Sequence, residues 1–519
     1  MKDLIDTMDA NPETVRGLLV SGARDWPDRP FVLFEDWGVW SRRDALEVAL
    51  SAAAAMQREG VRAGDRVCVI LPNGPDWLRA WWGAALLGAI VVPFNPSFVG
   101  RILEELLETT DPSFVIASSP VSEAPAKSRY ISPASLAVPS DTPPILSEIN
   151  GDSPHVIIFT SGTTGRSKGS LTSNFHVINQ SFWMAESGDV GESDRFMGDL
   201  PLFHMAALGN FTLMMRVGGS IALRTRPSLS RYWEIARDCE TTFGVLVSSM
   251  AAKLMQDPPS PADRDHKMRF FLSSPLPPDP AKFVERFGLE GLCTGFGSTE
   301  TSTALCKPLG QPVVTGSCGQ QRKGYELRIV DEDFNDVADG ERGELLIRTT
   351  RRTQMSLGYF NNPEATAEAW HDGWYRTGDL FERDAEGNFF WRDRLKDSIR
   401  RRGENVSSQE VEREINLYPG VLESACVAVQ GAFQGDEEIK AFLVIAGEID
   451  FGDLVRHLDG RLPYFMIPRF FERIDELPRT PTMKVQKFLL KERPAGPAHW
   501  DREAVGITLN RSSAVANSG

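Results

Sequence analysis

Residues 159–169 read Phe-Thr-Ser-Gly-Thr-Thr-Gly-Arg-Ser-Lys-Gly and directly follow the apolar run Val-Ile-Ile at 156–158. The β-branched run predicts a buried strand. The glycines and hydroxyl residues after it predict a loop whose backbone N–H groups and lysine suit a polyphosphate. The spacing is not Gly-x-x-x-x-Gly-Lys-Ser/Thr, which excludes an ordinary P-loop. The alternative is a plain surface turn rich in glycine, serine and threonine.

Composition limits the class of protein. The chain has 519 residues, of which 41% are hydrophobic, so two or more domains with ample cores are expected. A net charge of −15 argues against a nucleic-acid or anionic-membrane surface. The six cysteines include no Cys-x-x-Cys pair and the seven histidines are dispersed. Reduced thiols are therefore favoured over disulfides, and no zinc site is predicted.

Neither the N-terminus nor any apolar run indicates a membrane protein. Residues 1–6 carry acids where a signal peptide needs basic residues. The most apolar uncharged run, 80–92, stops at Pro93 and is shorter than the ~20 residues of a membrane span. We expect a soluble, cytoplasmic protein with no membrane span.

The hydrophobic pattern predicts an α/β fold. A strand at 67–71, a helix at 76–87 and a strand at 90–92 form a βαβ unit, which implies a parallel sheet. Similar units recur around 114–116, 156–158, 220–223 and 270–272. After Gly316 the pattern changes to short strands, such as 326–330 and 344–348, which predicts a distorted β-subdomain. In the C-terminal region, Ser407 to Glu410 fit a capping box at the start of a helix.

Four further motifs follow the first in order: Phe-Gly-Ser-Thr-Glu at 296–300, Trp-Tyr-Arg-Thr-Gly-Asp at 374–379, Asp-Arg-Leu-Lys-Asp at 393–397, and Pro-Arg-Thr-Pro-Thr-Met-Lys at 478–484. Together they make the chain resemble the adenylate-forming superfamily, which includes acyl-CoA synthetases, luciferases and peptide-synthetase adenylation domains. The resemblance covers the chain from Ala23 to Lys487. It implies a large N-terminal domain of βαβ-type sheets at 1–392, a hinge at 393–396, a small mobile α+β domain at 397–495, and a flexible tail at 496–519.

The resemblance also implies binding of ATP or AMP, Mg²⁺ and coenzyme A. The residues it implies for nucleotide and CoA binding are Thr160, Ser161, Gly162, Thr163, Thr164, Lys168, Ser273, Ser274, Pro275, Gly295, Phe296, Gly297, Thr299, Asp379, Arg394 and Gly403. Lys168 and the loop hydroxyls would hold the β- and γ-phosphates, and Thr299 would contact the α-phosphate. Glu300 and Thr160 would hold Mg²⁺. Phe296 would stack on adenine, and Asp379 would bind the ribose with Arg394 beside it.

The same resemblance gives catalytic roles to Lys484, His204, Glu300 and Lys396. Lys484 would act in adenylation, and Lys396 would be the hinge about which the small domain rotates. That rotation would bring Gly403 to the pantetheine tunnel, while His204 would lie beside the acyl carboxylate. The alternatives are a core histidine for His204, core filler for Phe296, a solvated turn carboxylate for Glu300, and surface ion pairs for Asp379 and Arg394.

The acyl pocket is expected to be apolar. Its candidate walls are His204, Met205, Leu208, Met250, Ser273, Gly295, Thr301 and Leu305. They include no obvious cation, so an apolar acid is favoured over a second carboxylate.

Three positions depart from the family pattern. Ser167 stands where the family usually has proline, Met483 where it has glycine, and Pro275 lies in a segment that usually reads Gly-Gly-Ala. Pro275 removes one backbone donor, and Met483 limits the positive-φ geometry that a glycine allows. Adenylation could therefore be slow or lost while the thiol step stays intact.

We interpret the sequence as an AMP-forming acyl-CoA synthetase. One alternative is a ligase that performs only thioesterification of a supplied acyl-adenylate, and another is an inactive, nucleotide-binding regulator. Peptide-synthetase adenylation is disfavoured because residues 201–210 lack an aspartate to pair with an amino group. The expected partners are a carboxylic acid or acyl-adenylate and CoA, with no nucleic acid, and the sequence is compatible with a homodimer.

Overall fold

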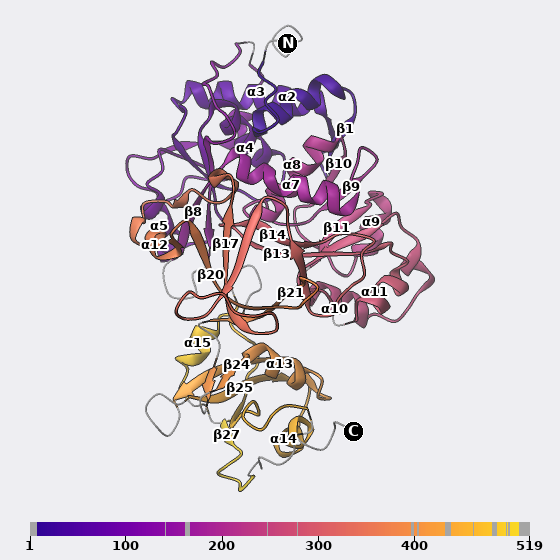
Figure 1. Ribbon diagram of the computed structural model, residues 1–519. Helices are drawn as coiled ribbons and strands as arrows, with labels where there is room; N and C mark the ends of the chain where they lie inside the picture. The colour runs from indigo at the N-terminus through magenta and orange to yellow at the C-terminus, as the bar shows by residue number, and fades with distance from the viewer. Residues whose placement is uncertain are drawn as a thin grey trace.

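The computed structural model describes residues 8–140, 142–160, 167–246, 248–277, 279–395, 399–401, 404–430, 437–459, 461–479, 485–494, 496 and 499–507. Of residues 248, 249, 400, 404 and 405 it describes the main chain alone. The chain forms a large N-terminal part and a smaller C-terminal part, which lies below it in Figure 1.

One sheet of the large part is mostly parallel and, within the described residues, has seven strands in the order β18-β8-β7-β4-β3-β5-β6. Its strands are β3 (Arg66–Ile70), β4 (Ile90–Pro93), β5 (Phe114–Ala117), β6 (Arg129–Ile131), β7 (Pro154–Thr160), β8 (Lys168–Ser173) and β18 (Gly358–Tyr359). The predicted βαβ unit is confirmed, because β3 and β4 pair in parallel and a helix connects them. β7 and β8 pair antiparallel, with Thr160 opposite Lys168.

A second sheet has 14 strands among the described residues, in the order β16-β17-β20-β21-β15-β14-β13-β12-β11-β9-β10-β1-β2, with β19 beside β20. Its strands are β1 (Pro30–Phe34), β2 (Val39–Ser41), β9 (Arg195–Gly198), β10 (Ser220–Leu223), β11 (Phe243–Leu246), β12 (Phe270–Ser273), β13 (Gly291–Ser298), β14 (Ser302–Lys307), β15 (Ser317–Gln321), β16 (Tyr325–Val330), β17 (Arg342–Thr349), β19 (Trp370–His371), β20 (Trp374–Arg383) and β21 (Phe389–Arg394). The short strands after Gly316 therefore extend the sheet that the parallel strands begin.

Helices separate and cover the two sheets (Figure 1). They are α2 (Val15–Asp25), α3 (Arg42–Arg58), α4 (Pro75–Leu87), α5 (Gly100–Thr110), α6 (Pro133–Leu136), α7 (Asn174–Gly188), α8 (Met205–Val217), α9 (Tyr232–Asp238), α10 (Ser248–Gln256), α11 (Pro280–Phe287) and α12 (Pro363–Ala369), with short 3₁₀ turns η1 (Pro261–Arg264) and η2 (Arg352–Gln354). α7 contacts β7 and β8 of one sheet and β14 of the other, so it lies between them. α4 is apolar on most of its surface and buries Trp77, Trp81 and Trp82, as expected of a helix covered on several sides.

The small C-terminal part has its own hydrophobic core. Its elements are β22 (Ile399–Arg401), β23 (Glu404–Val406), α13 (Ser408–Asn416), β24 (Val421–Gln430), β25 (Glu437–Ile445), α14 (Phe451–Asp459), β26 (Phe470–Arg473), α15 (Lys487–Lys491) and β27 (His499–Asp501). The predicted helix start is confirmed: α13 begins at Ser408, and the Ser407 side chain accepts a hydrogen bond from the N–H of Glu410. Val411 and Ile415 are fully buried on its inner face.

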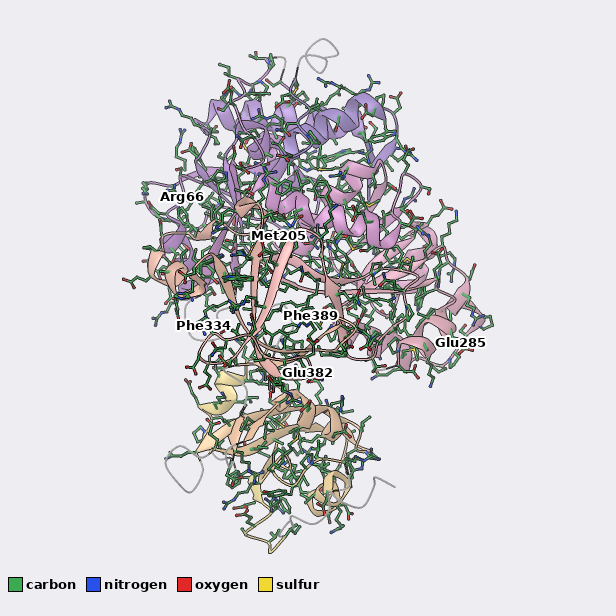
Figure 2. The ribbon with its side chains drawn as sticks, in the orientation of Figure 1. Arg66, Met205, Glu285, Phe334, Glu382 and Phe389 are labelled. Carbon is green, nitrogen blue, oxygen red and sulfur yellow. The ribbon has the colours of Figure 1, made fainter. Side chains whose placement is uncertain are left out.

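The two parts meet at the end of β21. The Ser407 hydroxyl donates to the carbonyl oxygen of Arg392 at 2.7 Å, and Ser408 donates from its backbone N–H and its hydroxyl to Asp393 Oδ2. Figure 2 places Glu382, on β20, at this end of the large part.

None of the described helices is long and apolar enough to cross a membrane.

Candidate functional site

Lys168 begins β8 at the end of the β7–β8 hairpin. It lies opposite Thr160, whose hydroxyl is 3.4 Å from the carbonyl oxygen of Lys168. The hairpin therefore delivers the threonine and the lysine to the same end of the seven-stranded sheet. The predicted phosphate-binding residues Ser161, Gly162, Thr163 and Thr164 lie outside the described residues.

Glu300 lies in the tight turn from β13 to β14. The turn needs glycine at 297, since a Cβ atom there would lie 2.0 Å from the carbonyl oxygen of Ser302. The register of the two strands also shifts between Phe296 and Gly297, as in a β-bulge. The turn buries Glu300 to 5% exposure, so its carboxylate has little contact with solvent. This environment does not fit the alternative of a solvated turn carboxylate.

Tyr359 connects Lys168 to Glu300. Its hydroxyl donates to Glu300 Oε1 at 3.0 Å, and the Lys168 Nζ lies 5.1 Å from the centre of its ring. Burial and the negative charge of Glu300 raise the pKa of Tyr359, which keeps its hydroxyl protonated as a donor. A cation and a buried carboxylate from distant parts of the chain are thus gathered around one side chain.

A buried histidine holds the main chain beside Glu300. His176, on α7, has its Nε2 3.0 Å from the carbonyl oxygen of Thr299 and its Nδ1 2.9 Å from that of Gln354. Burial lowers the pKa of His176 to about 4, so the ring is neutral at neutral pH. A neutral imidazole donates from one nitrogen only, so at neutral pH it donates to one of these two carbonyl groups.

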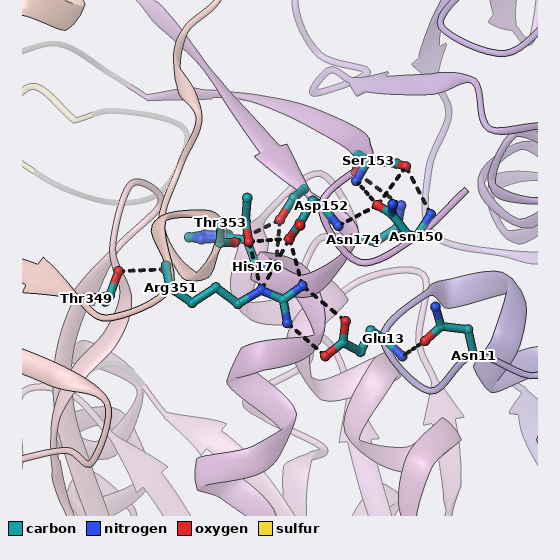
Figure 3. Close-up of polar contacts among 11 residues, drawn as sticks. Asn11, Glu13, Asn150, Asp152, Ser153, Asn174, His176, Thr349, Arg351 and Thr353 are labelled. Carbon is teal, nitrogen blue, oxygen red and sulfur yellow. Dashed lines mark hydrogen bonds and ion pairs between the residues drawn. The ribbon is translucent and has the colours of Figure 1, made fainter. Parts of the chain in front are cut away.

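An ionic cluster fixes the segment that leads to Tyr359 (Figure 3). Arg351 pairs with Glu13 at 2.8 Å and with Asp152 at 2.7 Å, and thereby ties η2 to the N-terminal segment and to the turn before β7. Thr353 also donates to Asp152. His176 lies beside this cluster in Figure 3.

The predicted ribose site is a buried carboxylate on β20. Asp379 is 3% exposed and lies directly opposite Arg394 in the β20–β21 ladder. Its Oδ1 accepts from the indole Nε1 of Trp391 at 2.8 Å and pairs with the Arg394 Nε at 3.0 Å. Asp379 is almost completely buried, which does not fit the alternative of a surface carboxylate, whereas the Arg394 side chain is 39% exposed.

The predicted adenine-binding segments lie on neighbouring strands. β12 and β13 are parallel, and the Ser274 hydroxyl donates to the carbonyl oxygen of Gly295 at 2.7 Å. The Ser273 hydroxyl donates to the carbonyl oxygen of Pro275 at 2.9 Å. Phe296 is half-buried, and Phe381 packs against it edge-to-face at 4.7 Å. This edge, at the carboxyl ends of parallel strands, is where α/β sheets commonly bind ligands.

The predicted acyl-pocket residues lie in different environments. His204 and Met205 form the start of α8, and the His204 ring packs on Phe203. Leu208 is fully buried in the core that includes α8, while Leu305, opposite Phe296, is fully buried in another hydrophobic cluster. Met250, on α10, packs against a third cluster, and Thr301 is buried in the turn after Glu300.

Several predictions fall outside the described residues, namely Lys396, Gly403, Met483 and Lys484. Four residues that contact the predicted site were not predicted: Tyr359, Tyr375, Trp391 and His176. Trp391 was detectable as an aromatic residue two positions before the hinge motif, and Tyr375 lies inside the ribose motif. Tyr359 and His176 carry no local signal, because their partners are distant in sequence.

The arrangement suits a nucleotide with its metal. Mg²⁺ prefers oxygen ligands and commonly takes one or two carboxylates together with phosphate oxygens. The buried Glu300 carboxylate meets this preference, with Lys168 near it for phosphate charge. Asp379 and Arg394 provide an acceptor and a donor for a ribose.

Comparisons with known proteins agree with this geometry. The AMP-binding enzyme family matches residues 20–360, and the C-terminal domain of AMP-binding enzymes matches residues 410–484. The chain is 31% identical over 502 residues to sulfoacetate–CoA ligase from Cupriavidus necator, which covers 92% of this chain and 97% of the relative. It is 30% identical over 470 residues to crotonobetaine/carnitine–CoA ligase from Salmonella heidelberg, and the match covers 83% of this chain and 89% of the relative. The structure of o-succinylbenzoate coenzyme A synthetase from Bacillus subtilis, solved with ATP and magnesium ion, matches with a TM-score of 0.81 and 25% identity. The match covers 92% of this chain and 99% of that structure.

Proposed function

This chain belongs to the AMP-binding enzyme family, and we propose that, as an AMP-forming acid–thiol ligase, it activates an apolar carboxylic acid and transfers the acyl group to coenzyme A. The observation that carries the proposal is the contact of Tyr359 with both Lys168 and Glu300. The contact gathers a cation and a buried carboxylate around one side chain, and this pairing supports a site for a nucleoside triphosphate and its Mg²⁺.

In the first half-reaction, a carboxylate oxygen of the acid attacks the α-phosphorus of ATP. The bond from that phosphorus to the bridging oxygen breaks, and pyrophosphate leaves. Because two anions approach each other, positive charge must be placed where negative charge accumulates. We assign this task to Lys168 for the β- and γ-phosphates and to Lys484 for the acid and the α-phosphate, with Glu300 and Thr160 as the residues that would hold Mg²⁺.

In the second half-reaction, the thiol of CoA loses its proton and attacks the acyl carbon, and AMP leaves. The acyl-adenylate must stay bound between the two steps. Phe296, Asp379 and Arg394 are suited to hold its adenosine, because they offer an aromatic face, an acceptor and a donor. Lys396 as the hinge and Gly403 at the pantetheine path complete the proposal, together with His204 beside the acyl carboxylate.

The acyl group is proposed to be apolar because the predicted wall residues include no obvious cation that would pair with a second carboxylate. The two related ligases are named for acids that carry a second charged group, so the panel of test acids should include sulfoacetate and crotonobetaine. We propose a cytoplasmic location, because the six cysteines are free thiols. We also propose a homodimer, which light scattering would test.

The experiment is a panel of carboxylic acids, measured separately for pyrophosphate release and for acyl-CoA formation. Linear and aromatic acids should give both products together with AMP, at higher kcat/KM than sulfoacetate or crotonobetaine. Glu300→Gln is the matched variant, because it removes the charge from the proposed metal ligand while keeping its shape. A preference for the charged acids would overturn the apolar pocket, and formation of ADP in place of AMP would overturn the proposed mechanism.

A further inference from the structure

We propose that Tyr359 is a positioning residue for adenylation: its hydroxyl orients the Glu300 carboxylate toward the Mg²⁺ that accompanies ATP, and its ring holds Lys168 beside the phosphates. The inference rests on the function proposed above. It adds a residue that none of the five motifs contains, and it separates the tasks of the hydroxyl and of the ring.

The hydroxyl acts on Glu300. Because Glu300 is buried in a tight turn, only a few contacts set the orientation of its carboxylate. The hydrogen bond from Tyr359 to Oε1 fixes the plane of the carboxylate and therefore the direction in which Oε2 points. Hydrogen-bond partners of metal ligands commonly tune metal affinity in this way, and removing one typically weakens metal binding by about 10- to 100-fold.

The ring acts on Lys168. The Nζ lies 5.1 Å from the ring centre, within the roughly 6 Å range of a cation–π contact. Phenylalanine presents a similar aromatic face, whereas leucine presents none. Tyr359→Phe therefore removes the contacts of the hydroxyl, with Glu300 and with Tyr375, and keeps the ring, whereas Tyr359→Leu removes the ring contact with Lys168 as well.

The main chain around Tyr359 is firmly held, as a positioning residue requires. Tyr359 pairs with Ser170 on β8, the strand that begins with Lys168. Its backbone N–H donates to the Thr366 hydroxyl at 2.9 Å, and Trp370 packs edge-on against its ring at 5.7 Å. The hydroxyls of Ser170 and Ser356 are 2.8 Å apart, which ties the segment before β18 to β8.

The test measures binding without turnover. Calorimetry would compare the affinities for AMP and for Mg²⁺ with α,β-methylene-ATP, whose α–β linkage the enzyme cannot break. Tyr359→Phe should weaken binding of the magnesium–nucleotide complex about tenfold and leave AMP affinity within twofold of wild type. Tyr359→Leu should weaken the magnesium–nucleotide complex further and also leave AMP affinity unchanged, because AMP lacks the β- and γ-phosphates.

Two controls show whether the hydroxyl acts through Glu300. In a Glu300→Gln background, Tyr359→Phe should weaken binding of the magnesium–nucleotide complex by less than twofold, since the carboxylate that the hydroxyl orients is already altered. Tyr130→Phe removes another tyrosine hydroxyl, which donates to the carbonyl oxygen of Ala117 at 3.2 Å on β5. That variant should bind both ligands as wild type does.

The outcomes separate the two proposals. If wild type binds the magnesium–nucleotide complex and Tyr359→Phe binds it equally well, the role of Tyr359 is wrong and the proposed function stands. Equal weakening of AMP and of the magnesium complex would show that Tyr359 only supports the fold, and this also overturns the inference. If wild type itself shows neither magnesium-dependent binding nor acid-dependent pyrophosphate exchange, the proposed function fails and the role of Tyr359 fails with it.

Discussion

Replacing Asp379 with asparagine should weaken the binding of AMP and ATP while leaving the fold intact. The carboxylate is 3% exposed and already receives the Trp391 indole at 2.8 Å and the Arg394 guanidinium at 3.0 Å. An amide whose oxygen takes the Oδ1 position can still accept from both donors, but it replaces Oδ2 with a donor NH₂ group and removes the negative charge that would strengthen a hydrogen bond from a ribose hydroxyl.

The expected size follows from these contacts. A hydrogen bond to a charged group contributes about 1.5–3 kcal/mol, and about 1.4 kcal/mol is a factor of ten in affinity. The Kd for AMP and the KM for ATP should therefore rise roughly 10- to 150-fold. Trp391→Phe keeps the carboxylate and an aromatic ring but removes one donor, so its effect should be smaller.

Calorimetric titration with AMP is the assay, and thermal unfolding checks that each variant is folded. Glu382→Gln is the matched control, since Glu382 pairs with Arg392 at 2.9 Å on the same β20–β21 hairpin and lies at the end of the large part next to the small part (Figure 2). It should bind AMP as wild type does. A folded Asp379→Asn protein with AMP affinity within twofold of wild type would refute the ribose role, as would an equal loss in the control.

Three further predictions concern catalysis, pH and packing. Lys484→Ala should slow adenylate formation by about 10²–10³-fold and leave CoA attack on supplied acyl-adenylate nearly intact. An equal loss of rate in the two half-reactions, each assayed alone, would argue against a role of Lys484 in adenylation. Burial lowers the pKa of His155 from 6.5 to about 3, and its Nε2 accepts from the Trp81 indole at 3.0 Å. The unfolded chain therefore binds the proton more readily, and wild type should lose about 2 kcal/mol of stability from this residue between pH 7 and pH 5. In denaturant titrations, His155→Gln should lose less unfolding free energy than wild type between pH 7 and pH 5. Parallel stability–pH profiles for the two proteins would contradict this. Gly297→Ala should lower the melting temperature and weaken nucleotide binding, because its Cβ would lie 2.0 Å from a carbonyl oxygen of β14. Gly191→Ala, where a Cβ meets nothing within 4 Å, should do neither, and similar melting curves for the two variants would disprove the steric argument.

Local patterns predicted much of the fold. The run at 67–71 became β3 at Arg66–Ile70, and the helix expected at 76–87 became α4 at Pro75–Leu87. These elements were predictable because β-branched runs, a proline and a glycine mark their ends within the segment itself. The continuity of β13 to β17, β20 and β21 in one sheet was not predictable, since it depends on pairing between segments far apart in the chain.

The site was predictable where its chemistry is concentrated in short motifs. The resemblance of short motifs to those of the family pointed to Glu300, Asp379 and Arg394; the structure buries both carboxylates, and the roles of the three residues stay predictions. The residues that hold these groups were missed. Tyr359 and His176 act through contacts with distant segments, and no composition or spacing rule marks a single tyrosine or histidine for such a role.

The most direct test of the account is ATP–pyrophosphate exchange measured with the preferred acid and without CoA. The account predicts rapid exchange that requires both the acid and Mg²⁺, because the acyl-adenylate forms reversibly before CoA acts. Absence of exchange, in an enzyme that still converts supplied acyl-adenylate and CoA to acyl-CoA, would contradict it and identify a ligase restricted to thioesterification.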